Sequence, residues 1–119
     1  MDFEIQKHTD YTLVKILDER LDVNNASDLK SELTAAHAGG EKNIVLDVSE
    51  SNYCDSSGLR AILVANRLCE DALGTFILTG LQREVEQIIR ITMLHTVLFI
   101  TRTTDEAVAI LMEKGKQNS

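Results

Sequence analysis

Residues 43–59 read NIVLDVSESNYCDSSGL, and this stretch decides the fold. Ile44, Val45 and Leu46 form an apolar run of the kind found in strands that are covered on both faces, so a buried strand is predicted over residues 43–48. A loop of small polar residues follows, and a helix is predicted to begin near Ser56 and to run to about Ala72. A buried strand, a loop and a helix in this order are typical of an α/β protein.

The segments on both sides continue this alternation. Further strands are predicted over residues 3–7, 11–17, 75–79 and 97–100. Three further helices are predicted. The first would be capped by the Asn24-Asn25 pair and end at the Gly39-Gly40 pair. The second covers residues 82–91, and the third follows a cap at Thr103-Thr104. Two opening strands followed by alternating helices and strands predict an α/β fold with parallel later strands. The pattern does not give the strand order.

Length and composition limit the kind of protein this is. The chain has 119 residues, of which 44% are hydrophobic and 26% charged, so we expect a single globular domain over residues 1–119 with a polar tail at about 114–119. Twelve basic against nineteen acidic residues give a net charge of −7, which argues against a nucleic-acid or anionic-membrane partner.

No stretch approaches the roughly 18 apolar residues of a membrane helix. The N-terminus lacks the basic and apolar regions of a signal peptide, so a cytoplasmic location is expected. Cys54 and Cys69 have no CxxC spacing and are predicted to be free thiols.

Ser56 is the candidate functional residue of the deciding stretch. As a hydroxyl at the start of a helix it is predicted to cap that helix by accepting a backbone N–H bond. As a phosphoserine it would add about −1.5 to −2 charges beside Asp55 and so change what the surface can bind. The alternative is that Asp55, Ser56 and Gly58 are ordinary capping residues.

Helical periodicity places other residues on the same face as Ser56. Leu59, Arg60 and Leu63 fall on this mostly polar face, whereas the core stripe holds Ala61, Ile62, Ala65, Leu68, Cys69 and Ala72. Leucines rimmed by charged residues suggest a contact site for a protein partner. Both leucines could instead lie under a loop or a neighbouring helix, and the sequence leaves the two readings open.

The stretch Asp55-Ser56-Ser57-Gly58-Leu59 closely resembles the signature of the STAS family, the bacterial anti-sigma factor antagonists. Leu21-Asp22 resembles a short acidic motif of the same family, and the likeness covers essentially the whole chain. The resemblance implies a STAS-like domain with a mixed sheet of about four to five strands. It also implies that Ser56 is a phosphoacceptor, with Asp22, Asp55, Ser57, Gly58 and Leu59 in the docking surface around it.

The partners that the resemblance implies are an anti-sigma factor with serine kinase activity and a serine phosphatase. The unmodified antagonist would bind the anti-sigma factor, and phosphorylation of Ser56 would abolish binding. The chain departs from the family pattern at Arg60, where a small residue is common, at Thr92-Met93-Leu94, where Ser-Gly-Leu is frequent, and in lacking a proline near the start of the third helix.

Three alternatives remain. The chain could be a STAS interaction module in a stress-signalling or transport-regulating complex that is never phosphorylated. A serine hydrolase would need GxSxG and a base near the serine, and His8, His37 and His95 are scattered. The third alternative is nucleotide binding, since the helix start near Ser56 could hold a phosphate, although neither GxxxxGK(S/T) nor GxGxxG is present. No metal-ligand spacing is present either, so neither a metal nor a cofactor is predicted, and no enzymatic activity is expected.

Overall fold

The computed structural model describes residues 3–117, with side chains up to Lys114. The strands in this range are β1 (Phe3–Lys7), β2 (Thr12–Ile16), β3 (Arg20–Leu21), β4 (Ile44–Asp47), β5 (Tyr53–Cys54), β6 (Phe76–Thr79) and β7 (Phe99–Thr101). The helices are α1 (Ala26–Ala38), α2 (Ser56–Asp71), α3 (Arg83–Ile91), the short 3-10 helix η1 (Leu94–Thr96) and α4 (Thr104–Gln117).

Five strands form one mixed sheet in the order β1-β2-β4-β6-β7. β1 runs antiparallel to β2, and every other neighbouring pair is parallel. The α/β class, the mixed sheet and the parallel later strands are therefore confirmed. The remaining strands, β3 and β5, pair with each other in parallel and form a separate two-stranded sheet.

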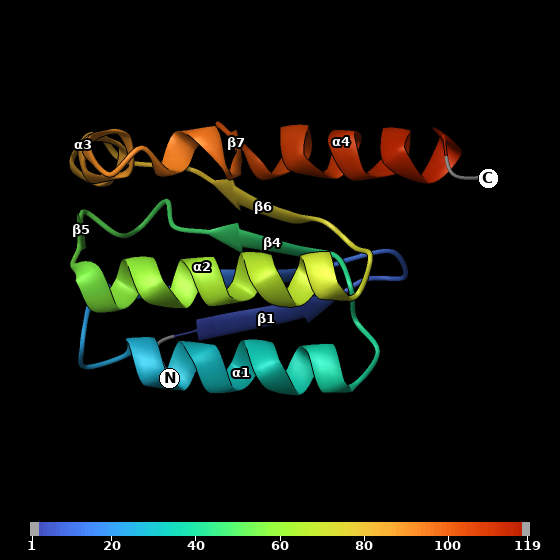
Figure 1. The fold of residues 1–119 in the computed structure, drawn as a ribbon, viewed down its shortest axis with the longest axis horizontal. Helices are drawn as coiled ribbons and strands as arrows, with labels where there is room; N and C mark the ends of the chain where they lie inside the picture. Colours follow the sequence, from blue (N-terminus) through green and yellow to red (C-terminus); the bar gives the residue numbers. More distant parts are fainter. Residues whose placement is uncertain (1–2, 118–119) are drawn as a thin grey trace.

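Helices cover both faces of the large sheet, which explains why β4 is buried along its whole length. Ile44 and Leu46 join the main core, to which α1, α2 and α3 contribute apolar side chains. Val45 faces the other side and packs with Ala107 and Leu111 of α4. Figure 1 shows α1 and α2 side by side in the lower half of the view and α4 at the top, with β4 and β6 between them.

The carboxyl ends of the parallel strands lie at one end of the molecule. Figure 1 shows the start of α2, β5 and α3 gathered at this end, on the left of the view, and the β1–β2 turn at the opposite end. In sheets of this type, binding groups concentrate at the carboxyl edge. The segment singled out in the sequence therefore begins its helix at the edge where partners are expected.

Several local predictions need correction. The two-residue strands β3 and β5 and the 3-10 helix η1 were not predicted, and β7 begins and ends later than the expected 97–100. α4 continues to Gln117, so the helix includes most of the segment expected as a polar tail; residues 118–119 lie outside the described range. Thr103 does cap α4, since its Oγ1 accepts a hydrogen bond from the Glu106 N–H at 3.2 Å.

Candidate partner-docking site

Asp55, and not Ser56, is the residue that caps α2. Its backbone is extended (φ −100°, ψ −174°), and its Oδ1 accepts a hydrogen bond from the Gly58 N–H at 3.0 Å. Both Asp and Ser are good capping residues, but α2 already includes Ser56, so it begins one residue earlier than a Ser56 cap would require. The prediction that Ser56 is the cap is therefore wrong, and a carboxylate occupies the positively polarised helix end.

The other oxygen of Asp55 ties the start of α2 to the loop between β3 and α1. Asp55 Oδ2 accepts a hydrogen bond from the Val23 N–H at 3.3 Å, and the Asp55 N–H donates to the Leu21 carbonyl at 3.2 Å. Two segments 32 residues apart are thus joined through one side chain. Since both carboxylate oxygens already accept bonds, Asp55 is held in a fixed position beside Ser56.

Ser56 itself is the first residue of α2 and is exposed. Its Oγ makes no hydrogen bond to any other residue in the part of the chain that the structure describes. Because Asp55 caps α2, the Ser56 hydroxyl is not needed to stabilise the start of the helix. The geometry leaves this oxygen accessible to a modifying enzyme.

Asp22, the other acidic residue of the predicted docking surface, is buried and fully engaged. Its Oδ2 accepts from Arg20 Nε at 3.0 Å, its Oδ1 accepts from the Asn24 N–H at 3.0 Å, and its own N–H donates to Asn25 Oδ1 at 3.0 Å. Asn25 was expected to cap α1, but its side chain closes this loop and makes no capping bond. Asp22 therefore shapes the loop that Asp55 contacts, and its carboxylate does not point freely to solvent.

The hydrogen bonds to Asp22 predict a pH dependence of stability. The hydrogen bond from Arg20, followed by that from the Asn24 N–H, lowers the pKa of Asp22 below its ordinary value of 3.8. The resulting stabilisation is present above the unfolded-state pKa and is lost as the pH falls through the lower folded-state pKa.

In denaturant titrations, the wild-type advantage over Asp22→Asn should therefore shrink as the pH falls from about 6 to about 2. A difference in unfolding free energy that stays constant over this range would contradict the assigned contacts.

Gly58 is buried against β3 and β5. A Cβ atom at this position would lie 2.4 Å from the Leu21 carbonyl oxygen and 2.8 Å from Cys54 Sγ. The lack of a side chain thus allows the first turn of α2 to touch the small sheet. Gly58 belongs to the predicted docking surface only indirectly, by setting how close Ser56 and Ser57 lie to the 22–25 loop.

The two leucines predicted on the Ser56 face have different environments. Leu59 is buried (9% exposed) and joins the main core, so of the two readings left open for this residue, burial under neighbouring elements is the one the structure supports. Leu63 is 38% exposed and keeps the predicted position, as does the exposed Arg60. The start of α2 packs against both the large sheet and the β3–β5 pair, which widens its buried face beyond a simple stripe.

Other exposed residues near the site were missed from the sequence. Val23, whose N–H is bonded to Asp55, is 68% exposed, and Tyr53 on β5 is 41% exposed. The Arg20 guanidinium lies 3.9 Å from the centre of the Tyr53 ring, because Arg20 and Tyr53 are paired in the β3–β5 register. An exposed aliphatic side chain, a tyrosine and an arginine are suited to a protein interface. Strands of two residues give no periodic signal that could have revealed them.

Both cysteines are free and buried. Burial, with the nearby Asp55 charge as a smaller cause, raises the pKa of Cys54 to about 12. Burial raises the pKa of Cys69 to about 11. Neither thiol carries appreciable thiolate near neutral pH, so Cys54 contributes packing to the site and no nucleophile.

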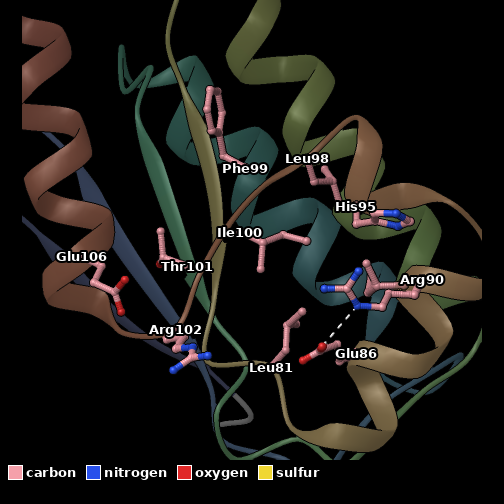
Figure 2. A pocket seen from close by; sticks show the side chains of 11 residues that line it. Leu81, Glu86, Arg90, His95, Leu98, Phe99, Ile100, Thr101, Arg102 and Glu106 are labelled. Carbon is pink, nitrogen blue, oxygen red and sulfur yellow. Dashed lines mark hydrogen bonds and ion pairs between the residues drawn. The ribbon is translucent and has the colours of Figure 1, made fainter.

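Apart from the Ser56 site, the surface has a hollow along the open edge of β7, between α3 and α4 (Figure 2). It has a volume of about 670 Å³, and the Glu86–Arg90 ion pair (3.2 Å) crosses one wall. The lining residues are Leu81, Glu86, Ile89, Arg90, His95, Leu98, Phe99, Ile100, Thr101, Arg102 and Glu106. None of the docking residues predicted around Ser56 lines it, so it is a feature separate from the Ser56 site.

The structure also bears on the enzymatic alternative. Within residues 3–117, no histidine forms a hydrogen bond with Ser56, and His8 stacks on Tyr11 in the turn between β1 and β2. The described part of the chain contains no cluster of three or more histidine, cysteine or acidic residues able to hold a metal. None of the helices described is long and apolar enough to cross a membrane.

Comparisons with known proteins agree on one family. A model of the STAS domain matches residues 2–107. The chain is 27% identical over 100 residues to BtrV of Bordetella bronchiseptica, named as a candidate anti-sigma factor antagonist, and the match covers 84% of this chain and 86% of BtrV.

Two solved structures show the same fold. One is a candidate anti-sigma factor antagonist from Thermotoga maritima (TM-score 0.83, 23% identity, 92% of this chain and 94% of that one). The other is the phosphorylated form of the Bacillus cell fate determinant SpoIIAA (TM-score 0.72, 19% identity, 92% and 98%).

Proposed function

The chain belongs to the STAS domain family, and we propose that it is an anti-sigma factor antagonist whose partner binding is controlled by phosphorylation of Ser56. The observation that carries this proposal is that Asp55 and Ser56 have different roles at the start of α2. Asp55 caps the helix, while the neighbouring Ser56 hydroxyl is exposed and has no structural partner among the described residues. Ser56 can therefore be modified without loss of the cap.

The chemistry of the control is a reversible phosphoryl transfer. The partner, an anti-sigma factor with serine kinase activity, would supply a bound nucleoside triphosphate. Ser56 Oγ passes its proton to a base of the kinase and forms a bond to the γ-phosphorus, the bond to the bridging oxygen breaks, and a nucleoside diphosphate leaves. A serine phosphatase would reset the protein by directing water at the same phosphorus, which releases inorganic phosphate and restores the hydroxyl. The cycle places the protein in the cytoplasm, where sigma factors act.

Electrostatics explain why a phosphate would block binding. The modification adds about −1.5 to −2 charges directly beside the fixed carboxylate of Asp55. Two unit charges about 5 Å apart repel by about 3 kcal/mol at an effective dielectric of 20. A partner that must desolvate this pair, or that presents an acidic group to it, would lose affinity by about two orders of magnitude.

The proposed docking surface combines direct and supporting residues. The exposed side chains would contact the partner, and they are Ser56, Arg60, Leu63, Val23, Tyr53 and Arg20. Ser57 lies beside them and is half-buried. The supporting residues would not contact the partner directly but would hold the 22–25 loop and the start of α2 in place; they are Asp22, Asp55, Gly58 and Leu59. The competing proposal, a STAS interaction module that is never phosphorylated, uses the same surface with Ser56 as a contact residue only.

The test is to purify the protein from its native cells and compare the material that carries a co-purifying partner with the material that does not. Intact mass and peptide mapping should find the bound fraction unmodified at Ser56 and a single phosphate on Ser56 in the free fraction. Phosphoserine at position 56 within the partner-bound fraction would contradict the proposal.

A further inference from the structure

We infer that Arg60 is captured by the phosphate on Ser56, so that phosphorylation also removes a cation from the docking surface. This inference rests on the proposed phosphorylation of Ser56. It concerns a residue at which the chain departs from the small residue common in its family, and it assigns that residue a regulatory contact.

Helix geometry brings the two residues together. Ser56 and Arg60 are four residues apart in α2, and both are exposed. Residues at this spacing lie one above the other, about 6 Å apart along the helix axis. An arginine side chain easily spans that distance, and its planar guanidinium can donate two parallel hydrogen bonds to phosphate oxygens. The order of charges, negative before positive along the helix, is the favourable one.

Arg60 is also available, whereas two other exposed arginines, Arg20 on β3 and Arg67 farther along α2, are already engaged. Arg20 donates to Asp22 and lies over the Tyr53 ring, and Arg67 pairs with Asp71 at 3.6 Å. Arg60 makes no ion pair or hydrogen bond with any residue in the range that the structure describes. A phosphate at Ser56 would therefore meet one free guanidinium within reach.

Asp55, the acidic residue at the start of α2, does not compete for Arg60. Both oxygens of Asp55 accept backbone N–H bonds, from Gly58 and from Val23, and this keeps the carboxylate at the helix end. In the unmodified protein Arg60 is thus open to an acidic group of the partner. In the phosphorylated protein the same guanidinium would be bound within the chain. The partner surface that this predicts carries a carboxylate opposite Arg60.

The test is a phosphorus-31 NMR titration of full-length protein with phosphoserine incorporated at position 56 during translation, so that no kinase is needed. Arg60 stabilises the dianion, and its loss in Arg60→Gln should raise the second pKa of the phosphate, ordinarily about 6, by roughly 0.3 to 0.6 of a pH unit. Asp55 and the helix dipole act equally in both proteins. The Arg60 Nε–H signal should also shift when unmodified and phosphorylated wild-type proteins are compared.

Arg67→Gln is the matched control, because it removes an exposed arginine of the same helix that is already paired. It should leave the phosphate titration unchanged. Coincident titrations of wild type and Arg60→Gln, with no shift of the Arg60 Nε–H signal, would overturn the capture of Arg60. That result is distinguishable from failure of the proposed function, which would appear as unchanged partner binding when position 56 is phosphorylated.

Discussion

Replacing Ser56 by aspartate is expected to weaken binding of the anti-sigma factor by about a hundredfold, while Ser56→Ala leaves binding within about threefold. Aspartate places a fixed charge beside the carboxylate of Asp55, which cannot turn away because both of its oxygens accept backbone hydrogen bonds. Alanine removes only an exposed hydroxyl that makes no hydrogen bond to other described residues. Titration calorimetry with the partner that co-purifies with the wild-type protein measures both affinities.

The same pair of variants should have nearly the same thermal stability as the wild type, because Asp55 caps α2 in all three. Ser56→Asn serves as a control of similar size to aspartate without charge, and it should bind far better than Ser56→Asp. Equal affinities of the aspartate and alanine variants would favour the constitutive interaction module over the phosphorylation-controlled antagonist.

The second large effect is expected at Gly58. A Cβ at this position would lie within 3.0 Å of the Leu21 carbonyl oxygen, the Leu21 Cγ and the Cys54 Sγ. Overpacking typically costs about 1–3 kcal/mol, and a contact of 2.4 Å with a backbone oxygen puts Gly58→Ala at the upper end of that range. The helix propensity of alanine returns about 1 kcal/mol. Gly58→Ala should therefore lower the free energy of unfolding by about 2 kcal/mol, because the rigid carbonyl cannot move without disturbing β3.

Urea denaturation of Gly58→Ala measures this loss, and Gly39→Ala is the control. At Gly39 the nearest atoms to an added Cβ are the Ala36 and Ala35 carbonyl oxygens at 3.4 and 3.5 Å, which is close to ordinary contact. We expect Gly39→Ala to stay within about 0.5 kcal/mol of the wild type. A Gly58→Ala protein as stable as the wild type would show that α2 does not need this close approach to β3.

The longer helices and strands could be predicted because their apolar residues recur with a clear period. Ile44, Val45 and Leu46 are an apolar run, and burial on both faces of the sheet is the physical reason for it. The order of the strands was not predictable, because it depends on which strands pair and not on the character of any one segment. The exposed edge of β7 and the hollow beside it therefore appear only in the structure.

At the candidate site, the sequence located the helix start but not the roles within it. Asp55 and Ser56 are both capping residue types, and the choice between them follows from the tertiary hydrogen bonds of Asp55 to Val23 and Leu21. Helical periodicity considers one buried side, so it could not decide whether Leu59 is exposed or buried. The first turn of α2 also packs against β3 and β5, whose two-residue strands left no pattern to detect.

The most direct test of the phosphorylation control is to measure the affinity of the purified anti-sigma factor for two forms of the full-length protein, one with serine and one with phosphoserine at position 56. We predict tight binding of the serine form and a loss of about a hundredfold or more for the phosphoserine form, with the fold unchanged by circular dichroism. Equal affinities for the two forms would contradict the account.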